Sequence, residues 1–141
     1  MRSTESTGLD DATAQELSER LADIFRSADV GDVLADDVFF DGHPPFWRFQ
    51  LQGRDAFASW LRGYVRDGTE ITVVRTIPTV TGFVTELVGA HDEDGEQVTD
   101  RKILLVEVRD GRIAELVVYC SGDWDADLRA RHAAETQLIR P

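Results

Sequence analysis

Asp100 and Lys102 have the residue types and the spacing that proton transfer requires. They lie two positions apart in VTDRKILLVEVR, a β-rich run, so their side chains are expected on one face of a strand. In a shared apolar cavity the Lys would favour the ionised Asp, whereas burial would disfavour both charges. We expect this pair to shuttle a proton. The alternative is that both side chains are solvated at the open end of the sheet.

Tyr64 and His43 are two further candidates for acid–base chemistry. Tyr64 ends the apolar stripe of a predicted helix, so its hydroxyl could donate a hydrogen bond into a cavity; the alternative is a core tyrosine whose hydroxyl is satisfied. His43 follows a predicted strand near the expected mouth of the cavity, where the alternative is a loop histidine in water.

Residues 47–52 alternate apolar with polar side chains and are expected to border a ligand. Arg48 offers a planar fork of donors for a carboxylate or carbonyl oxygen, unless the segment is an edge strand with its polar side in water. Trp47 and Trp60 could clamp a ring, although packing in the core competes with that interpretation.

Cys120 is the only cysteine, so an internal disulfide is excluded. No adjacent basic residue would lower its pKa, and we expect a small buried hydrophobe that borders the ligand. The run HDEDGE, residues 91–96, lacks the spaced carboxylates of a calcium loop; it predicts a turn, and no metal site is expected. Asp123 and Asp125 are assigned to capping the last helix.

Hydrophobic periodicity predicts the elements that position these residues. A helix is expected over 13–28, capped by Asp10 or Asp11, followed by a helical turn or short helix over 29–36 and a brief strand over 38–42. A second helix begins near residue 53. Four β-rich runs then form an antiparallel meander, and a closing helix ends the chain; these five segments are 70–80, 82–90, 98–109, 112–120 and 124–135.

This order of elements predicts an α+β fold in which helices cover one face of a curved antiparallel sheet. Residues 12–141 are expected to form a single domain, preceded by a disordered or flexible tail over residues 1–11. A sheet that half wraps around helices leaves a concavity between them, where a ligand would sit.

Four stretches, LADDVFFDGHPP, GRDAFASWLRGY, TGFVTELVG and VRDGRIAELVVYCSGDWD, resemble the nuclear transport factor 2-like superfamily. The resemblance covers about residues 12–125 and is strongest to the SnoaL-like branch, which includes ketosteroid isomerases and limonene epoxide hydrolases. It implies a cone-shaped α+β fold with a short C-terminal helix, a mostly apolar pocket and a homodimer formed through the outer face of the sheet.

The catalytic residues of these relatives are missing at the matching positions. The resemblance places the isomerase base at Gly42, and the Arg and the two Asp of the epoxide hydrolases at Leu87, Gly89 and Val118. None of these four residues can bind or move a proton, so neither mechanism carries over to this chain.

The register of the strands decides which side chains face the cavity, because a slip of one residue exchanges the two faces. Pairing His91 with Glu96 would put Leu87 opposite Asp100 and Thr85 opposite Lys102.

The turn at 109–111 has two alternatives. A three-residue loop would pair Val108 with Arg112, placing Lys102 beside Val118 and Asp100 beside Cys120, whereas a two-residue loop would flip the last strand. The three-residue loop agrees with the inward face of the family and is preferred. It predicts an inner face of Thr85, Leu87, Asp100, Lys102, Leu104, Leu116, Val118 and Cys120, with Glu86, Arg101, Ile103, Val117 and Tyr119 outside.

The net charge of −12 argues against nucleic acid and against anionic membranes as partners. The first residues contain no apolar run, so we expect neither a signal peptide nor a membrane span, and a cytoplasmic protein.

These features predict an enzyme that acts on a small, largely apolar metabolite by proton transfer, as in a cyclisation, isomerisation, elimination or hydrolysis. No cofactor is expected, because the sequence has no phosphate loop or dinucleotide fingerprint. The alternative is a non-catalytic protein of the same fold that binds a small molecule or associates as a dimer.

Overall fold

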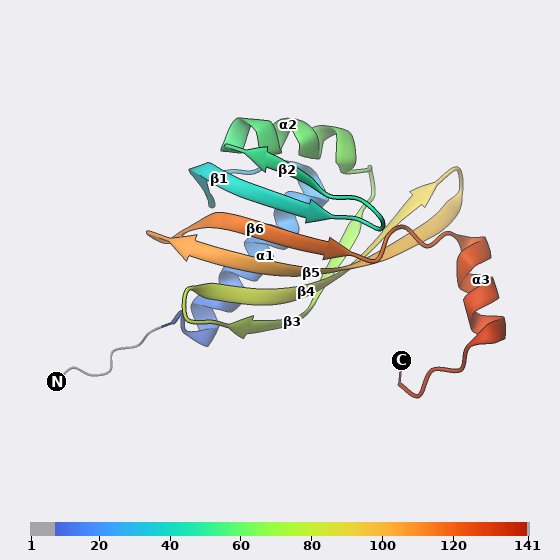
Figure 1. The fold of residues 1–141 in the computed structure, drawn as a ribbon. Helices are drawn as coiled ribbons and strands as arrows, with labels where there is room; N and C mark the ends of the chain where they lie inside the picture. The colour runs from blue at the N-terminus through green and yellow to red at the C-terminus, as the bar shows by residue number, and fades with distance from the viewer. Residues whose placement is uncertain (1–7, 141) are drawn as a thin grey trace.

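A curved, unclosed sheet of six strands forms the body of the protein (Figure 1). The computed structural model describes residues 8–140. The strands run in the order β2-β1-β6-β5-β4-β3, and all neighbours are antiparallel except β1 and β6, which are parallel. Their bounds are β1 Leu34–His43, β2 Phe49–Gln52, β3 Glu70–Pro78, β4 Gly82–Glu93, β5 Glu96–Arg109 and β6 Arg112–Cys120.

Three helices accompany the sheet in the described part of the chain. α1 (Asp11–Ser27) crosses one face and packs against β3 and β4, and α2 (Arg54–Tyr64) lies over β1 and β2. α3 (Ala126–Glu135) stands to one side of the sheet, beside the start of β5 (Figure 1). The predicted α+β class, with a curved sheet, helices that cover it and a short C-terminal helix, is therefore confirmed.

α1 begins where the sequence places a cap. The Asp10 carboxylate accepts a hydrogen bond from the Thr13 backbone N–H at 2.7 Å, which satisfies one of the donors left free at a helix start. The helix ends at Ala28, which adopts a left-handed conformation with φ 63°. Of the tail predicted over 1–11, residues 1–7 lie outside the described residues, and Asp11 already belongs to α1.

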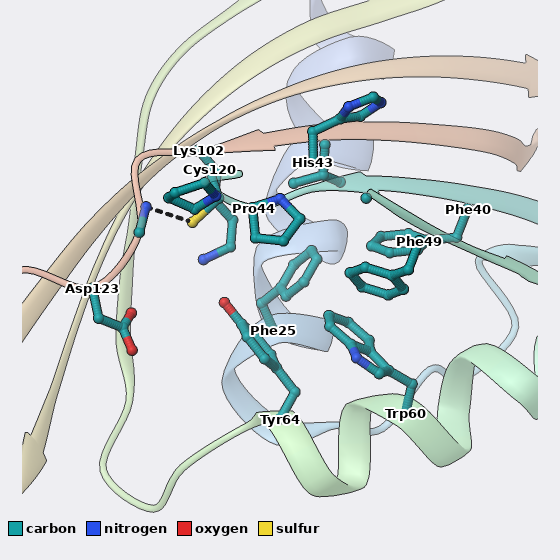
Figure 2. A pocket seen from close by; sticks show the side chains of 14 residues that line it. Phe25, Phe40, His43, Pro44, Phe49, Trp60, Tyr64, Lys102, Cys120 and Asp123 are labelled. Carbon is teal, nitrogen blue, oxygen red and sulfur yellow. Dashed lines mark hydrogen bonds between the residues drawn. The ribbon is translucent and has the colours of Figure 1, made fainter. Parts of the chain in front are cut away.

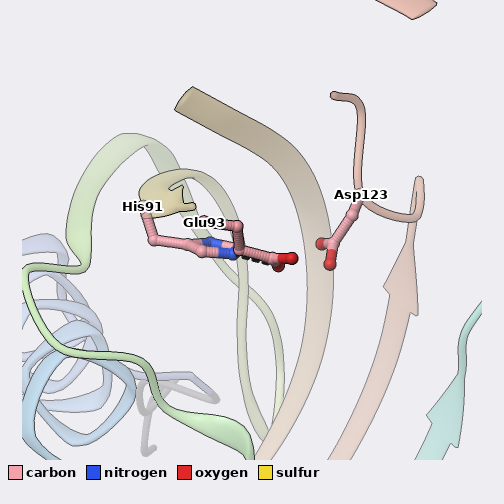
Figure 3. Close-up of side chains that lie close together, drawn as sticks. All are labelled: His91, Glu93 and Asp123. Atoms are coloured by element: carbon pink, nitrogen blue, oxygen red, sulfur yellow. Dashed lines mark hydrogen bonds and ion pairs between the residues drawn. The ribbon is translucent and has the colours of Figure 1, made fainter. Parts of the chain in front are cut away.

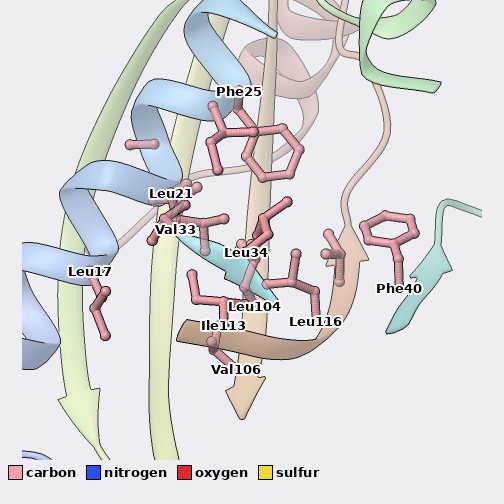
Figure 4. Close-up of a cluster of buried hydrophobic side chains, with 14 of the residues drawn as sticks. Leu17, Leu21, Phe25, Val33, Leu34, Phe40, Leu104, Val106, Ile113 and Leu116 are labelled. Atoms are coloured by element: carbon pink, nitrogen blue, oxygen red, sulfur yellow. The ribbon is translucent and has the colours of Figure 1, made fainter. Parts of the chain in front are cut away.

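The hydrophobic core lies between α1 and the inner face of the sheet (Figure 4). Burial of each large apolar side chain contributes about 1.5–3 kcal/mol. Its fully buried members include Leu21, Ile24, Leu34, Phe57, Phe83, Leu104, Ile113 and Leu116.

Of the two alternatives for residues 29–36, a helical turn or a short helix, the helix is wrong, because residues 31–33 form a turn and β1 already begins at Leu34. The Asp29 carboxylate accepts the Gly31 N–H, and the Ile113 N–H donates to the Val33 carbonyl oxygen at 2.8 Å. Pairing with β6 therefore overrides the local helical pattern, and β1 is longer than the strand expected over 38–42.

The predicted register between β4 and β5 is wrong by two residues. Asp94 and Gly95 both have positive φ and form a tight turn that pairs Glu93 with Glu96. Lys102 consequently lies opposite Leu87, and Asp100 lies opposite Gly89. A shift of two leaves every side chain on its predicted face.

The loop predicted between β5 and β6 is also wrong. Asp110 and Gly111 form a two-residue turn with positive φ, and Arg109 pairs with Arg112. A β-bulge near Ala114 then adds one residue to β6, which restores the expected face, and Lys102 lies opposite Cys120 rather than Val118. The buried state of Thr85, Leu87, Leu104, Leu116 and Val118 matches the predicted inner face.

The outer face of the sheet carries exposed apolar side chains from two neighbouring strands, namely Ile103, Leu105 and Tyr119. The homodimer predicted through this face stays a prediction. Within residues 8–140, no helix is both long and apolar enough to cross a membrane.

Candidate functional site

A cavity of about 410 Å³, here called the inner cavity, opens between the sheet, α1 and α2 (Figure 2). Its volume falls within the range of sites for small molecules. The wall is largely aromatic and apolar, and its polar side chains gather at one end. The apolar side chains are Phe25, Phe40, Pro44, Pro45, Phe49, Trp60 and Val118, and the polar group is Tyr64, Lys102, Cys120 and Asp123.

α2 and the strands β1 and β2 build the aromatic wall. Trp60 and Tyr64 lie four residues apart on α2, so their rings stack, with centroids 4.6 Å apart and an interplanar angle of 16°. Phe40 and Phe49 approach Trp60 at 5.1 and 5.4 Å. A Cβ at Gly42 would lie 2.7 Å from the Phe49 ring, so the glycine lets these rings close over β1.

Lys102 places a cation at the polar end of the inner cavity. It is the only lysine among the fifteen basic residues, a signal that the sequence already carried. Its side chain is 7% exposed, and its ammonium forms an ion pair with Asp100, whose side chain is 8% exposed. Burial by itself would lower the pKa of Lys102, but Tyr64 and Asp100 outweigh burial and raise it above its ordinary value. The ammonium is therefore charged throughout the neutral range.

Tyr64 presents its hydroxyl to the same end of the cavity, and Figure 2 shows the phenol pointing toward the Lys102 ammonium. Burial raises the pKa of Tyr64, and the charge of Lys102 opposes this shift only in part. The Lys102 Nζ also lies 5.4 Å from the centroid of the Tyr64 ring and 5.7 Å from that of Phe25. The phenol is therefore protonated at neutral pH and is a hydrogen-bond donor.

The Asp100 carboxylate holds the Lys102 ammonium through their ion pair and lies on the side of a second, smaller recess. The carboxylate fills the space above Gly89, where a Cβ would overlap with Oδ1. Asp100 borders this recess, of about 110 Å³, and not the inner cavity, whereas Lys102 borders both. Lys102 and Asp100 pair across the sheet with Leu87 and Gly89 of β4. Leu87 and Gly89 are the positions that the resemblance gives to the Arg and an Asp of the epoxide hydrolases.

Cys120 completes the polar end of the inner cavity. The Gly122 N–H donates to its sulfur at 3.3 Å, and the thiol lies 3.7 Å from Asp100 Oδ2. Burial raises the pKa of the Cys120 thiol. The group is therefore a protonated thiol rather than an activated nucleophile.

His43 is among the residues that border the inner cavity, but its ring points away from the other side chains of the site (Figure 2). The imidazole stacks on the outward-facing ring of Tyr119 at 4.3 Å and lies 3.3 Å from Asp41 Oδ1. The parallel pairing of β1 with β6 sets this orientation, because His43 pairs with Tyr119. The structure thus separates His43 from Lys102 and Tyr64.

Trp47 and Arg48 also lie outside the cavity. Trp47 is 72% exposed near the start of β2. Arg48 donates to both carboxylate oxygens of Asp41, at 2.9 and 3.0 Å, and this bidentate pair lowers the pKa of Asp41 to about 2. The donor fork of Arg48 is therefore occupied within the protein.

Thr85 and Leu87 face inward as expected, but they are buried in the core and do not border the inner cavity. The Thr85 hydroxyl lies 3.2 Å from Thr76 Oγ1 and also donates to the Arg75 carbonyl oxygen. Of the residues predicted to act on or bind a ligand, the structure brings together Trp60, Tyr64, Asp100, Lys102, Val118 and Cys120.

Asp123 is the polar residue that sequence reasoning assigned incorrectly. Asp125, and not Asp123, caps α3, because its carboxylate accepts the Leu128 N–H at 2.8 Å. The Asp123 carboxylate has no hydrogen bond or ion pair within residues 8–140, and it borders both the inner cavity and the smaller recess. Two aspartates in front of one helix offer no local signal that separates the cap from the site.

Comparison with known proteins supports the fold. No protein-family model matches the sequence, and no curated protein matches it. Among solved structures, an LEH-like epoxide hydrolase from M. tuberculosis is similar, with a TM-score of 0.63 and 23% identity over 78% of this chain and 84% of that chain. An NTF2-like protein of unknown function from Mesorhizobium loti has a TM-score of 0.60 and 22% identity, over 81% of this chain and 97% of that one.

A computationally designed 17-OHP binder is also similar, with a TM-score of 0.61 and 20% identity over 76% of this chain and 89% of that chain. These similarities show that the chain has the nuclear transport factor 2-like fold. Since this fold hosts both an epoxide hydrolase and a designed binder, the reaction has to be argued from the side chains of the cavity.

Proposed function

We propose that this protein is an enzyme that acts on a small, largely apolar molecule by proton transfer at the polar end of the inner cavity. The observation that carries the proposal is the Lys102 ammonium, which is buried, charged and directed at an aromatic cavity. A cation in such surroundings acts on a nearby oxygen more strongly than it would in water, because the local dielectric is low.

The aromatic wall restricts the substrate to a flat or compact apolar body. Trp60 and its stacked neighbours supply rigid faces, and Pro44 and Pro45 narrow the mouth. The polar end requires one oxygen on that body, such as a carbonyl, an epoxide or a carboxylate, in reach of Lys102 and Tyr64. Isomerisation, cyclisation, elimination and hydrolysis all include a step in which such an oxygen gains negative charge.

Lys102 and Tyr64 have separate roles in this proposal. The ammonium stabilises negative charge that develops on the substrate oxygen, and this favours the transition state over the bound substrate. The Tyr64 hydroxyl donates its proton to the same oxygen, and the adjacent cation stabilises the phenolate that results. Asp100 keeps the ammonium in place and balances its charge, so it is a positioning residue.

Binding without turnover is the second candidate function. Lys102 is too basic to accept a proton at neutral pH, and Asp100 is held in the ion pair behind it. A carboxylate ligand would then remain bound as the partner of the ammonium. In that case the protein stores or delivers the ligand.

The experiment that separates these functions is a panel of apolar carbonyl, epoxide and carboxylate compounds, assayed for turnover by mass spectrometry and for binding by thermal shift. We expect turnover of at least one carbonyl or epoxide compound, reduced about 100-fold or more in Lys102→Met and in Tyr64→Phe. Arg101→Met is the matched control, because Arg101 lies on the same strand but faces outward and is exposed.

Thermal stabilisation without turnover would favour the binding protein, since a ligand that binds only the folded state raises its stability. Undiminished turnover in a correctly folded Lys102→Met variant would contradict the proposed mechanism. Equal losses in Lys102→Met and Arg101→Met would show that the effect does not come from the inner cavity.

A further inference from the structure

The side chains of His91, Glu93 and Asp123 lie close together (Figure 3), and His91 and Asp123 border the smaller recess. One nitrogen and two carboxylate oxygens of these side chains all lie within 4.8 Å of one another. His91 Nε2 lies 2.8 Å from Glu93 Oε2, and the His91 side chain is only 11% exposed. We propose that these three side chains bind a divalent transition-metal ion, with Zn²⁺ as the preferred ion.

Backbone hydrogen bonds hold the three residues close together. Ala90 of β4 pairs with Thr99 of β5, and Thr99 forms an isolated antiparallel bridge with Trp124. The Thr99 N–H donates to the Trp124 carbonyl oxygen at 3.0 Å, and the Trp124 N–H donates back at 2.7 Å. His91 and Asp123 each adjoin a residue of this row, so the sheet brings the two side chains together.

The charges around the recess favour a cation. Asp100 and Asp123 border the recess together with Lys102 and Arg66, and Glu93 lies beside His91. The ammonium of Lys102 forms its ion pair with Asp100. Arg66 forms an ion pair with Glu93 at 3.9 Å, so the carboxylate of the three ligands that lacks a positive partner among the described residues is that of Asp123. Asp123 has no ion-pair partner in the described part of the chain, so a divalent ion would supply the missing positive charge.

The donor set indicates the type of ion. One imidazole nitrogen with two carboxylate oxygens suits Zn²⁺ and its neighbours in the transition series, whereas Mg²⁺ and Ca²⁺ prefer oxygen ligands alone. Metal–ligand bonds of about 2.0–2.2 Å require the ligand atoms to close up further than in this arrangement. Asp123 is exposed and can make that movement, and water would complete the coordination.

Metal binding would act on the inner cavity through Asp123, which borders both spaces. Drawing Asp123 to the ion would remove its carboxylate from the polar end of the inner cavity and fix the segment that follows β6. Metal binding itself does not depend on the proposed reaction, because Lys102 and Tyr64 are not ligands.

Titration of the full untagged chain with ZnCl₂, MnCl₂, MgCl₂ and CaCl₂ tests the proposal by calorimetry and thermal shift. We expect one Zn²⁺ per chain, bound at least about tenfold more tightly than Mg²⁺ or Ca²⁺. Asp123→Asn and His91→Gln should each weaken Zn²⁺ binding about tenfold or more. Asp92→Asn on the same hairpin and His132→Gln on α3 should leave it unchanged.

The chain has three histidines, so imidazole ¹⁵N spectra identify the ligand directly. Zn²⁺ should shift the His91 resonance and leave those of His43 and His132 in place. Because Asp123 is exposed, Asp123→Asn should fold even if His91→Gln does not. Three results would each overturn the proposal. They are a failure of the wild type to bind Zn²⁺, a Zn²⁺-induced shift at His43 or His132 instead of His91, and full Zn²⁺ affinity in a folded Asp123→Asn variant.

Discussion

The inner face of β5 and β6 is packed at one end and hollow at the other. Toward the β5–β6 turn, Leu104 and Leu116 are buried in the same cluster as Leu21 of α1. Toward the opposite end, Lys102 and Cys120 face the inner cavity. The same pair of strands therefore supports both the core and the candidate site, and the difference lies in what covers them.

That difference has a physical cause in the two helices. α1 fills the space above one end with aliphatic side chains, whereas the rings of α2 stack on one another and leave a space between themselves and β6. A buried charge is stable at the hollow end only because an opposite charge accompanies it. The packed end owes its stability to close contact, and the hollow end to charge balance.

Lys102→Met tests the charge balance and has the largest expected effect. The variant leaves Asp100 buried without its partner, and we expect the free energy of unfolding at pH 7 to fall by about 3–5 kcal/mol, measured in urea. Adding Asp100→Asn should recover most of this loss. A single variant as stable as the wild type would contradict the balance of charges at the hollow end.

The difference in stability between wild type and Lys102→Met should depend on pH in a definite direction. The folded pKa of Lys102 lies above its ordinary value, so its contribution is complete below about pH 10.4 and is lost only as the pH rises further. The stability difference between wild type and Lys102→Met should therefore be constant from pH 6 to about pH 9. Selective ¹³C labelling of lysine gives one side-chain signal, which should not titrate in that range.

Leu104→Ala tests the packed end. Leu104 is fully buried, and removing its side chain should lower the free energy of unfolding by about 2–5 kcal/mol. The matched control is Leu105→Ala, the next residue on β5, which is 43% exposed on the outer face and should cost less than about 1 kcal/mol. Similar losses in both variants would mean that the two faces are assigned incorrectly.

Gly89→Ala tests whether the space above β4 is reserved for Asp100. The added methyl group would overlap with the Asp100 carboxylate, and we expect a loss of about 1–3 kcal/mol in the free energy of unfolding. Gly63→Ala on α2 meets no atom within 4 Å and should be neutral or stabilising by about 0.5–1 kcal/mol. Equal stability of the two variants would argue against the observed position of Asp100.

Arg48→Gln has the smallest expected effect, because its ion pair with Asp41 lies on the outer surface and Arg48 is 60% exposed. The folded pKa of Asp41, about 2, lies below its ordinary value of 3.8, so the stabilisation is present above pH 4 and is lost toward pH 2. Thermal melts should show a small difference between wild type and variant at pH 5–7 that shrinks at pH 2. A difference that persists at pH 2 would assign another role to Arg48.

Sequence periodicity predicted the three helices, the meander and the alternation along its strands, because alternation and helical spacing are local properties. The inward face of the last strand was chosen from the family resemblance. Both predicted turns were wrong, yet the faces were right for two different reasons. Between β4 and β5 the error was an even number of residues, and between β5 and β6 the bulge near Ala114 compensated for the shorter turn.

The site was predicted less completely than the fold. Asp100 and Lys102 were selected for their residue types and their spacing on one strand face, and Tyr64 because it ends the apolar stripe of its helix; the three side chains do lie together. His43 points outward because β1 pairs with β6, and Arg48 is occupied by Asp41. Neither contact leaves a mark in the local sequence.

The sequence by itself determined the α+β class, the alternation of faces along each strand and the strongly acidic character of this protein, since each follows from neighbouring residues or from composition. Only the tertiary structure decided that a cavity remains beside Lys102 and that Asp123 meets His91. Those outcomes depend on how segments distant in the chain close on one another, and hydrophobic patterning specifies that they pack without specifying which polar side chains meet.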